Sequence, residues 1–223
     1  MGMLDWLFKK PNFSRVDDTF ALKREMLWEG IRTTLQAPTL KNKSTWLIVH
    51  FIDTFTEIQE RLEQWGFEYE IVSSKLNASQ LDRTGLITNQ AFPAPLKLIL
   101  SELIPAPQDS AVLLPADPNK HVAMIILERH PQIRHDQRLE AFARSVPLMV
   151  EFGYFLALDD PTVQLSFDQK VAEILKQLGL KNQLVSSNMV TKRLETVLKR
   201  IADDFGGDTP CDSAEQWLMV NSR

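Results

Sequence analysis

The chain has 223 residues, of which 24% are charged and 44% hydrophobic, and its formal net charge is −4. This length and this proportion of charged to hydrophobic residues are typical of a globular protein whose core forms without disulfides or metal ions. The negative net charge excludes nucleic-acid binding through a general positive field. The one cysteine, Cys211, excludes an intramolecular disulfide and a cysteine-based zinc site.

Four elements are expected in the first third of the chain: a helix at 16–35, a strand at 44–51, a helix at 53–65 and a strand at 67–74. Asp53 or Thr54 would cap the second helix, and Gly66 would end it. A strand, a helix and a strand in this order form a βαβ unit, so we expect a parallel sheet.

Predicted strands and predicted helices continue to alternate along the chain up to Pro161. The further expected elements are strands at 84–89, 110–115, 121–128 and 151–160, and helices at 94–104 and 132–144. After Pro161 two amphipathic helices follow, the first closed by Gly179 and the second capped by Ser186 or Ser187. Residues 206–213 are predicted to form a flexible tail with an apolar end.

These elements predict an α/β domain with a mostly parallel sheet, followed by C-terminal helices. The predicted parts are an N-terminal amphipathic segment at 1–15, the α/β domain at 16–160, a helical extension at 161–205 and a tail at 206–223. No stretch approaches the roughly 18 apolar residues of a spanning helix. The N-terminal sequence lacks the features of a secretory signal, so we expect a cytoplasmic protein.

Common catalytic motifs are absent from the sequence. None of the 8 glycines belongs to a phosphate-binding loop, and no serine lies in a nucleophile elbow. His130 and His135 are five residues apart, which does not suit one helical face, so we interpret them as solvated or hydrogen-bonded side chains and expect no metal and no cofactor. Asp159 and Asp160 end a predicted strand, where ligands of parallel sheets bind, but we expect a structural role for them.

The stretch 126–161, ILERHPQIRHDQRLEAFARSVPLMVEFGYFLALDDP, resembles the C-terminal motor half of SecA, the ATPase that drives preprotein translocation. In that family a strand ending in T-E-R-H precedes a helix with D-N-Q-L-R-G-R-A-G-R-Q-G and a strand ending in S-L-E-D. The matching residues in this chain are Glu128, Arg129, His130, Arg134, Asp136, Leu139, Ala143, Leu156, Leu158 and Asp160.

The resemblance extends in both directions and covers roughly residues 17–205. GLITNQAFPAP is similar to the family's T-I-A-T-N-M-A-G-R-G-T-D and keeps Thr88, Asn89 and Ala91. SSNMVTKRLETVLKRI is similar to the start of the family's long scaffold helix. The resemblance implies a three-layer RecA-like domain of the P-loop NTPase superfamily, of the helicase C-terminal type, followed by the beginning of that scaffold.

The departures from the family pattern concern the chemistry. RecA-like motors bind ATP between two domains, of which the second supplies arginines that stabilise the transferring phosphoryl group. This chain has no counterpart of the first domain, and Glu140, Phe142 and either Arg144 or Ser145 occupy the positions of the family's glycine-spaced arginines. The degenerate former nucleotide face implied by the resemblance consists of Thr88, Asn89, Arg129, His130, Asp136, Glu140, Phe142 and Arg144. We therefore expect no ATPase activity from this chain alone.

A degenerate motor domain of this kind is expected to act as a non-catalytic interaction or regulatory module, linked to protein translocation, with a protein partner or a second copy and no small-molecule substrate. The alternative is a nucleotide-binding module or ATPase subunit that completes a cleft with a partner bearing Walker motifs. The apolar residues near the former nucleotide face form either a docking patch or part of a rearranged core, and they are Phe92, Pro93, Pro95, Phe142, Val146, Pro147, Leu148 and Met149.

The first ten residues form a second candidate contact. In MGMLDWLFKK the apolar side chains fall on one face of a short helix, and two lysines follow, which suits shallow contact with an anionic membrane. The candidate contact residues are Leu4, Trp6, Leu7, Phe8, Lys9 and Lys10. Packing on the domain is the alternative for so short a segment that contains an acid.

Overall fold

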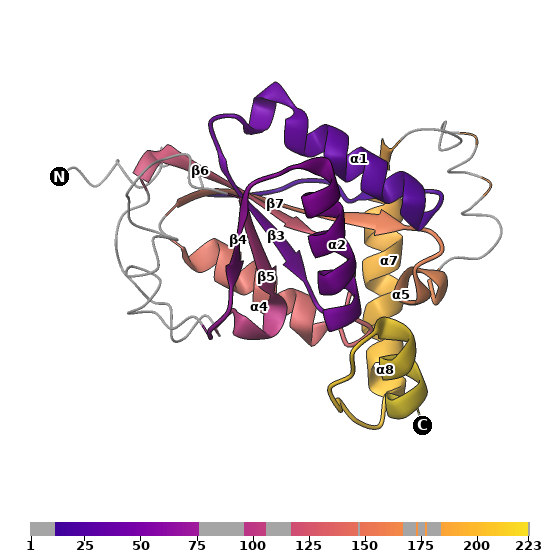
Figure 1. Ribbon diagram of the computed structural model, residues 1–223. Coiled ribbons are helices and arrows are strands. Elements are labelled where there is room, and N and C mark those ends of the chain that lie inside the picture. The colour runs from indigo at the N-terminus through magenta and orange to yellow at the C-terminus, as the bar shows by residue number, and fades with distance from the viewer. Residues whose placement is uncertain are drawn as a thin grey trace.

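The computed structural model describes residues 12–75, 96–105, 117–146, 148–166, 173, 177 and 184–222. Its centre is an eight-stranded sheet in the order β4-β5-β3-β6-β7-β2-β8, and β1 also pairs with β7 (Figure 1). The strands are β1 (Phe13–Arg15), β2 (Thr19–Ala21), β3 (Ser44–Val49), β4 (Tyr69–Val72), β5 (Leu96–Leu100), β6 (Asp117–Ile126), β7 (Leu148–Ala157) and β8 (Val185–Ser186).

All strand pairings are parallel among the described residues, except that β8 runs antiparallel to β2. The longest pairing joins β6 to β7, with Val122 opposite Val150 and Ile126 opposite Tyr154. The three-layer, mostly parallel α/β class expected for a RecA-like domain is therefore confirmed by the sheet topology. The predicted βαβ unit is also present, because β3 and β4 run parallel on either side of β5.

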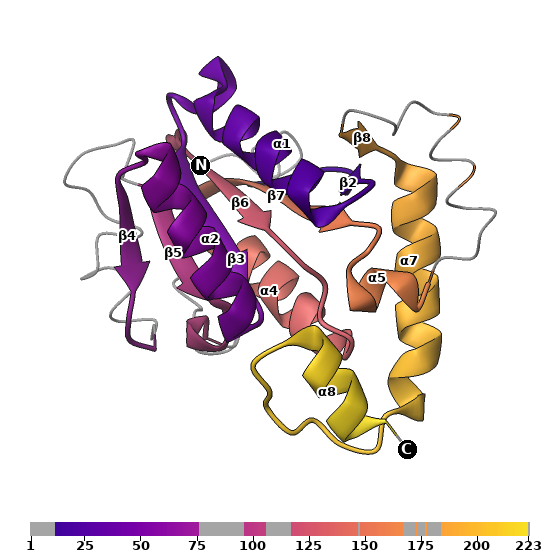
Figure 2. The same cartoon turned by 45° about the vertical axis from the view of Figure 1, so that its right-hand side comes forward.

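Two hydrophobic cores lie on the two faces of the sheet. Helices α1 (Arg24–Gln36) and α2 (Ile52–Trp65) cover one face, and α4 (Arg134–Ser145) and α7 (Asn188–Ile201) cover the other (Figures 1 and 2). In β3, Trp46 and Ile48 belong to the core under α4 and α7, whereas Leu47 and Val49 belong to the core under α1 and α2. The central strand is thus buried on both faces, as its continuous apolar sequence requires.

The ends of α2 show which local signals the sequence carries. Gly66 ends the helix with φ 73°, a left-handed conformation that glycine adopts without a steric penalty, as predicted. The predicted cap at Asp53 or Thr54 is wrong, because the N-cap position is Phe51, which has no capping side chain. The capping group comes from a distant strand and is described below.

Two predicted helices differ from the structure. The helix expected at 16–35 begins only at Arg24, because residues 13–21 contain the short strands β1 and β2, which pair with β7. The helix expected at 94–104 is wrong, because residues 96–100 form β5 and residues 101–103 a 3₁₀ turn. A short apolar run is compatible with either a buried strand or a buried helix, and here pairing with β3 and β4 selects the strand.

The C-terminal part packs back onto the sheet. Val190, Leu194 and Leu198 of α7 lie in the core shared with α4, and Ser187 caps this helix as predicted. The short α5 (Pro161–Gln164) precedes it, with Asp160 as its cap. Residues 206–213 differ from the expected tail, because they lead into a further helix, α8 (Ala214–Asn221), whose Trp217 is buried.

Other predicted features lie outside the described residues. They are the N-terminal segment with its candidate membrane contacts at residues 4–10, the strands at 84–89 and 110–115, Thr88, Asn89 and Ala91, the residues of the apolar set at 92–95 and 147, and the helix end at Gly179. Within the described part, no helix is long and apolar enough to cross a membrane.

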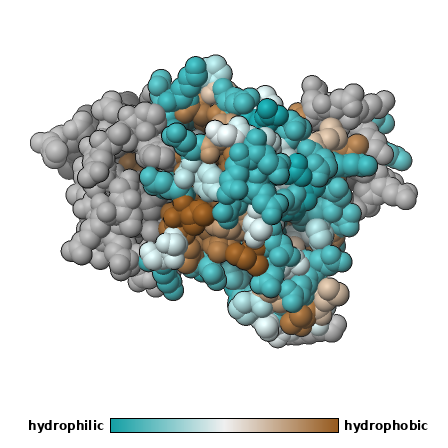
Figure 3. Space-filling model, in the orientation of Figure 1, coloured by the Kyte–Doolittle hydropathy of each residue, from teal (hydrophilic) through white to brown (hydrophobic). Residues whose placement is uncertain are grey.

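The described surface is mostly hydrophilic on the face that carries α1 and α2 (Figure 3). Hydrophobic side chains gather there toward the lower ends of β4 and α2 and again on α8. The large exposed hydrophobic residues of these elements are Ile52, Ile71, Met219 and Val220. Exposed apolar residues therefore mark the end of the molecule at which the parallel strands terminate.

Candidate functional site

Polar residues follow three neighbouring parallel strands where each strand ends. His50 comes directly after β3, Glu128, Arg129 and His130 come after β6, and Asp160 comes after β7. The four that follow β6 and β7 are at least nine-tenths buried, and the side chain of His50 is fully buried as well. Because parallel strands bring their carboxyl ends to one edge, where α/β proteins bind ligands, this carboxyl edge is the candidate functional site.

Glu128 supplies the missing cap of α2. Its Oε1 accepts hydrogen bonds from the backbone N–H groups of His50 (2.7 Å) and Phe51 (2.9 Å). Its Oε2 accepts one from Thr54 Oγ1 at 2.7 Å. A carboxylate at a helix N-terminus satisfies free N–H groups and interacts favourably with the helix dipole. All these contacts lie inside the fold, so Glu128 joins β6 to α2 and is not presented to a ligand.

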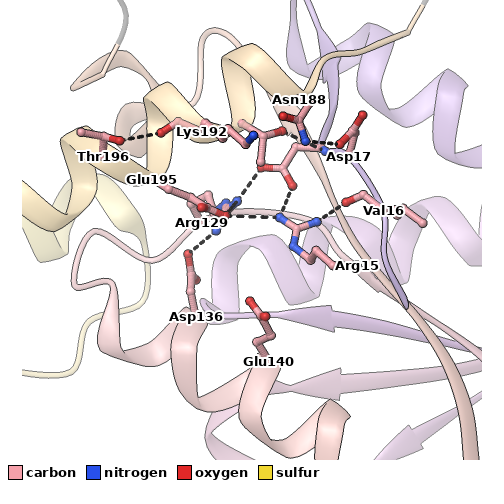
Figure 4. A network of polar contacts seen from close by, with 12 residues as sticks. Arg15, Val16, Asp17, Arg129, Asp136, Glu140, Asn188, Lys192, Glu195 and Thr196 are labelled. Atoms are coloured by element: carbon pink, nitrogen blue, oxygen red, sulfur yellow. Dashed lines mark hydrogen bonds and ion pairs between the residues drawn. The ribbon is translucent and has the colours of Figure 1, made fainter. Parts of the chain in front are cut away.

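Arg129 is the centre of a buried ion network, drawn in Figure 4. Its guanidinium donates to Asp18 and, at 3.1 Å, to Asp136, and it lies 3.5 Å from the ring centroid of Tyr154. Burial alone would lower the pKa of Arg129, but Asp18, Tyr154 and Asp136 outweigh burial and raise it. Arg129 is therefore a permanent cation that two carboxylates neutralise within the fold.

Asp136, in the first turn of α4, joins this network to β6 and to the end of β3. It accepts from the His130 backbone N–H at 3.2 Å. His50 Nε2 lies 2.9 Å from the Asp136 carboxylate, without the alignment of a hydrogen bond. Burial would raise the pKa of Asp136, but His50 and Arg129 lower it below its ordinary value. The carboxylate is thus ionised and occupied by its neighbours.

A pocket of about 390 Å³ opens beside this network. It lies between α4 and α7 and is lined by Arg129, Ile133, Asp136, Gln137, Glu140, Ala141, Arg144, Tyr154, Glu195 and Lys199. The lining contains three cations and three carboxylates, so it offers no excess of positive charge. The Nε of Arg129 is buried and lacks a partner among the described residues, a demand that one water molecule can meet.

The outer rim of the pocket is also internally paired. Arg144 contacts Glu140 one helical turn earlier, in an exposed ion pair, and its guanidinium lies 4.0 Å from the ring centroid of Phe13. Glu195 of α7 approaches Arg129 to 3.6 Å and Arg15 to 3.7 Å. Each of these arginines therefore faces a carboxylate of the same chain.

The structure brings together part of the residue set that the resemblance implied. Arg129, Asp136, Glu140 and Arg144 all line the pocket. Phe142 does not face it, because its side chain is fully buried in the core beside Trp46, with 6.5 Å between ring centroids. Val146 and Leu148 are also core residues, so the described buried members of the apolar set support the rearranged-core alternative.

Sequence reasoning missed several members of the network. Asp18 precedes β2, inside the range 16–35 for which the sequence predicts a helix, and it is fully buried beside Arg129 and Arg15. Glu195 belongs to an ordinary amphipathic pattern in α7. An isolated buried acid has no local signature in a sequence, and only the partner cation identifies it.

His130 lies at the carboxyl edge among aromatic rings. Its ring stacks on Phe51 at 5.2 Å and contacts His135 at 4.0 Å and Trp217 at 5.2 Å, measured between centroids. Burial, with the nearby His50 and His135, lowers the pKa of His130 to about 2. His130 is therefore neutral under ordinary conditions.

His130, His135 and Asp208 offer three possible metal ligands within 4.8 Å of one another. Their hydrogen bonds do not favour that use. His130 Nδ1 accepts from the Gln132 backbone N–H at 3.0 Å, which places the proton of the neutral ring on Nε2. Asp208 already accepts bonds from Arg134, from His135 at 2.7 Å and from Trp217 at 3.1 Å. Asp208 is therefore held by hydrogen bonds from its neighbours, and the three groups are not a set of free metal ligands.

Comparisons with known proteins give limited matches. No family model matches the chain. The SecA protein translocase subunit of Amoebophilus asiaticus (strain 5a2) is 28% identical over 81 residues, which are 36% of this chain and 7% of that protein. The structure of T4 UvsW is similar with a TM-score of 0.46 and 11% identity, covering 88% of this chain and 40% of that one. The structure of the C-terminal part of the Fun30 ATPase domain is similar with a TM-score of 0.40 and 12% identity. That match covers 78% of this chain and 53% of the other.

Proposed function

We propose that this chain is a non-catalytic SecA-like module that acts by binding another protein, with a role linked to protein translocation. The chain spans 7% of the SecA protein that it matches, so a whole translocation activity is not carried over to it. The observation that carries the proposal is the internal pairing of Arg129 with Asp18 and Asp136, together with that of Arg144 with Glu140.

Phosphoryl transfer requires cations that remain available to the phosphate oxygens in the transition state. In the pocket between α4 and α7 the available arginines already have carboxylate partners. A phosphate entering there would displace these pairs and would meet the repulsion of Asp136, Glu140 and Glu195. These features support a protein-binding role over hydrolysis.

Nucleotide binding tests the enzymatic alternative directly. Thermal melting is measured with and without millimolar ATP or ADP and Mg²⁺, for the wild type and for Glu140→Arg. A ligand at 100 times its dissociation constant raises the stability by about 2.7 kcal/mol, which gives a clear melting shift. We expect no shift for either protein. A shift that Glu140→Arg increases would establish the alternative, a nucleotide-binding module completed by a partner.

The partner is tested with purified SecA from the same cell. We expect the chain to bind SecA or its membrane-bound complex, and to change the ATPase rate of SecA without hydrolysing ATP itself. Absence of binding to SecA and to its channel would overturn the link to translocation.

A further inference from the structure

The C-terminal segment 205–222, here called the cap, is held together by its own contacts. A β-bridge between Phe205 and Ser222 closes its two ends, and the Gly206 N–H donates to the Asn221 carbonyl at 2.9 Å. The Asn221 side chain accepts from the Thr209 N–H at 2.7 Å and donates to the Thr209 carbonyl at 3.1 Å. The cap can therefore move as a unit without losing these bonds.

The hydrophobic cluster of the cap is separate from both cores of the sheet. Its buried members are Phe51, Ala214 and Trp217, and only Phe51 belongs to the α/β domain. Trp217, which is 1% exposed, lies between Phe205 and His130. Trp217 is thus the large buried side chain of this cluster that the cap contributes.

The polar contacts of the cap converge on the start of α4. The surface that the cap contacts there is here called the seat, and it consists of Phe51, His130, Arg134, His135 and Arg138. Asp208 accepts from Arg134 and His135, and Arg138 lies close enough to be affected by its charge. A backbone hydrogen bond also joins the cap to the start of α2, from the Asp53 N–H to the Asp212 carbonyl at 3.0 Å. Burial alone would raise the pKa of Asp208, but the bonds from Arg134 and His135 lower it, so the carboxylate is charged in this seat.

The cap lies across the carboxyl edge of the sheet. In Figures 1 and 2, α8 sits beyond the ends of β3 and α2, beside the start of α4. It covers Phe51, directly after β3, and His130, after β6. Ligands of open parallel sheets bind outside this edge. The cap therefore occupies the place where a partner of the domain would be expected to dock.

Charge complementarity indicates what this seat accepts. Among the described residues Asp208 is the carboxylate of the cap that forms ion pairs with the domain, and the cap contains no lysine or arginine. The seat contains Arg134 and Arg138 together with the rings of Phe51, His130 and His135. An acidic segment with a large aromatic side chain satisfies both parts of this surface, as the cap itself does through Asp208 and Trp217.

We infer that the cap is an autoinhibitory segment, which fills a docking surface for an acidic, aromatic-bearing segment of a partner protein. This inference rests on the proposed function as an interaction module and names the site and its regulation. The Asp208 side chain is 21% exposed and that of Arg134 60%, so their ion pair is weakened by solvent and salt. A competing acidic segment can replace these contacts while the cap keeps its internal bonds.

The test uses the full chain with Asp208→Lys, which places a cation in the seat, and a labelled peptide with the cap sequence 205–222. The matched control is Glu215→Lys, which makes the same charge change at an exposed position of α8 that takes no part in the ion pairs of Asp208. Binding of the peptide is measured by fluorescence anisotropy, and hydrogen exchange is followed along the chain.

We expect the peptide to bind Asp208→Lys at least about tenfold more tightly than the wild type, because an occupied seat reduces the apparent affinity. Glu215→Lys should behave as the wild type, and a peptide carrying the Asp208→Lys change should not bind. Exchange should accelerate over 205–222 in Asp208→Lys alone, with protection of the sheet unchanged.

Equal peptide affinities for the wild type and Asp208→Lys would overturn the inference, and so would faster exchange throughout the chain. The peptide measurement involves neither nucleotide nor SecA, so its failure is distinguishable from failure of the proposed function. Peptide binding without SecA binding would leave the cap mechanism standing and remove only the link to translocation.

Discussion

The start of α4 takes part in two ion clusters, and they differ in burial rather than in composition. On one side Asp136 and Arg129, each 3% exposed, join β6 and α4 to Asp18 beside β2. On the other side Arg134 and His135 hold Asp208 of the cap, with Arg134 60% exposed. Both clusters contain a carboxylate with several donors. Only the first is centred on side chains that are almost fully buried.

This difference separates a structural cluster from an exchangeable one. A charge removed from a buried cluster leaves its partners without compensation in a medium where desolvation is costly. A charge removed from an exposed cluster is replaced by water and ions at little cost. The buried cluster therefore holds the domain together, whereas the exposed cluster can exchange one segment for another.

The largest expected effect tests the buried side. Arg129→Met leaves Asp18 and Asp136 without their shared cation, so we expect a loss of about 3–5 kcal/mol in the free energy of unfolding. Urea denaturation at neutral pH measures it. The matched control, Arg144→Met, breaks an exposed pair one helical turn apart and a contact with the Phe13 ring, and should cost no more than about 1.5 kcal/mol. Similar losses for the two variants would contradict the comparison.

A second prediction concerns Asp160, a buried carboxylate beside Glu128 and Arg24. Burial, together with Glu128, raises the pKa of Asp160 to about 7. The folded state therefore keeps a proton that the unfolded state releases above about pH 4, and stability falls as the pH rises from 4 to 7. Asp160→Asn keeps the capping oxygen of α5 without the charge.

We expect Asp160→Asn to be more stable than the wild type at pH 8, by up to about 4 kcal/mol, and to lose this advantage near pH 4. Urea denaturation across this pH range provides the comparison. Lower stability of Asp160→Asn at pH 8 would show that the ion pair with Arg24 outweighs the burial of the charge.

His130 gives the opposite pH dependence, because its pKa in the fold is lowered where that of Asp160 is raised. Because its pKa in the fold is about 2, only the unfolded state takes up a proton as the pH falls below 6.5. Stability from this residue is present above pH 6.5 and decreases by about 1.4 kcal/mol per pH unit below it. His130→Asn, which keeps an acceptor for the Gln132 N–H, should reduce this slope. An unchanged slope would contradict a neutral buried His130.

The smallest effect is expected on the exposed side. Asp208→Asn weakens the bonds to Arg134 and His135, and we expect a loss below about 1 kcal/mol in global unfolding. Hydrogen exchange should nevertheless accelerate in α8, because the seat is among the few contacts that hold the cap. A global loss as large as that of Arg129→Met would place the cap in the cooperative core.

Local patterns in the sequence predicted part of this fold correctly. The apolar run of β3, the helical period of α2, the left-handed glycine at position 66 and the serine cap of α7 each depend on residues within one or two turns. The strands β1 and β2 were missed because three residues carry no period, and their conformation comes from pairing with β7. For β5 the apolar run was compatible with both a helix and a strand.

The sequence by itself determined the alternating α/β order, the two apolar faces and the absence of common phosphate-binding motifs. Each of these features depends only on the spacing of residues that are close together in the sequence. Only the tertiary structure decided the partners of the charges. Arg129 meets Asp18 across 111 residues, and His135 meets Asp208 across 73. Whether such a charged side chain holds the domain together or forms an exchangeable contact depends on its exposure to water. Exposure is a property of the packed chain.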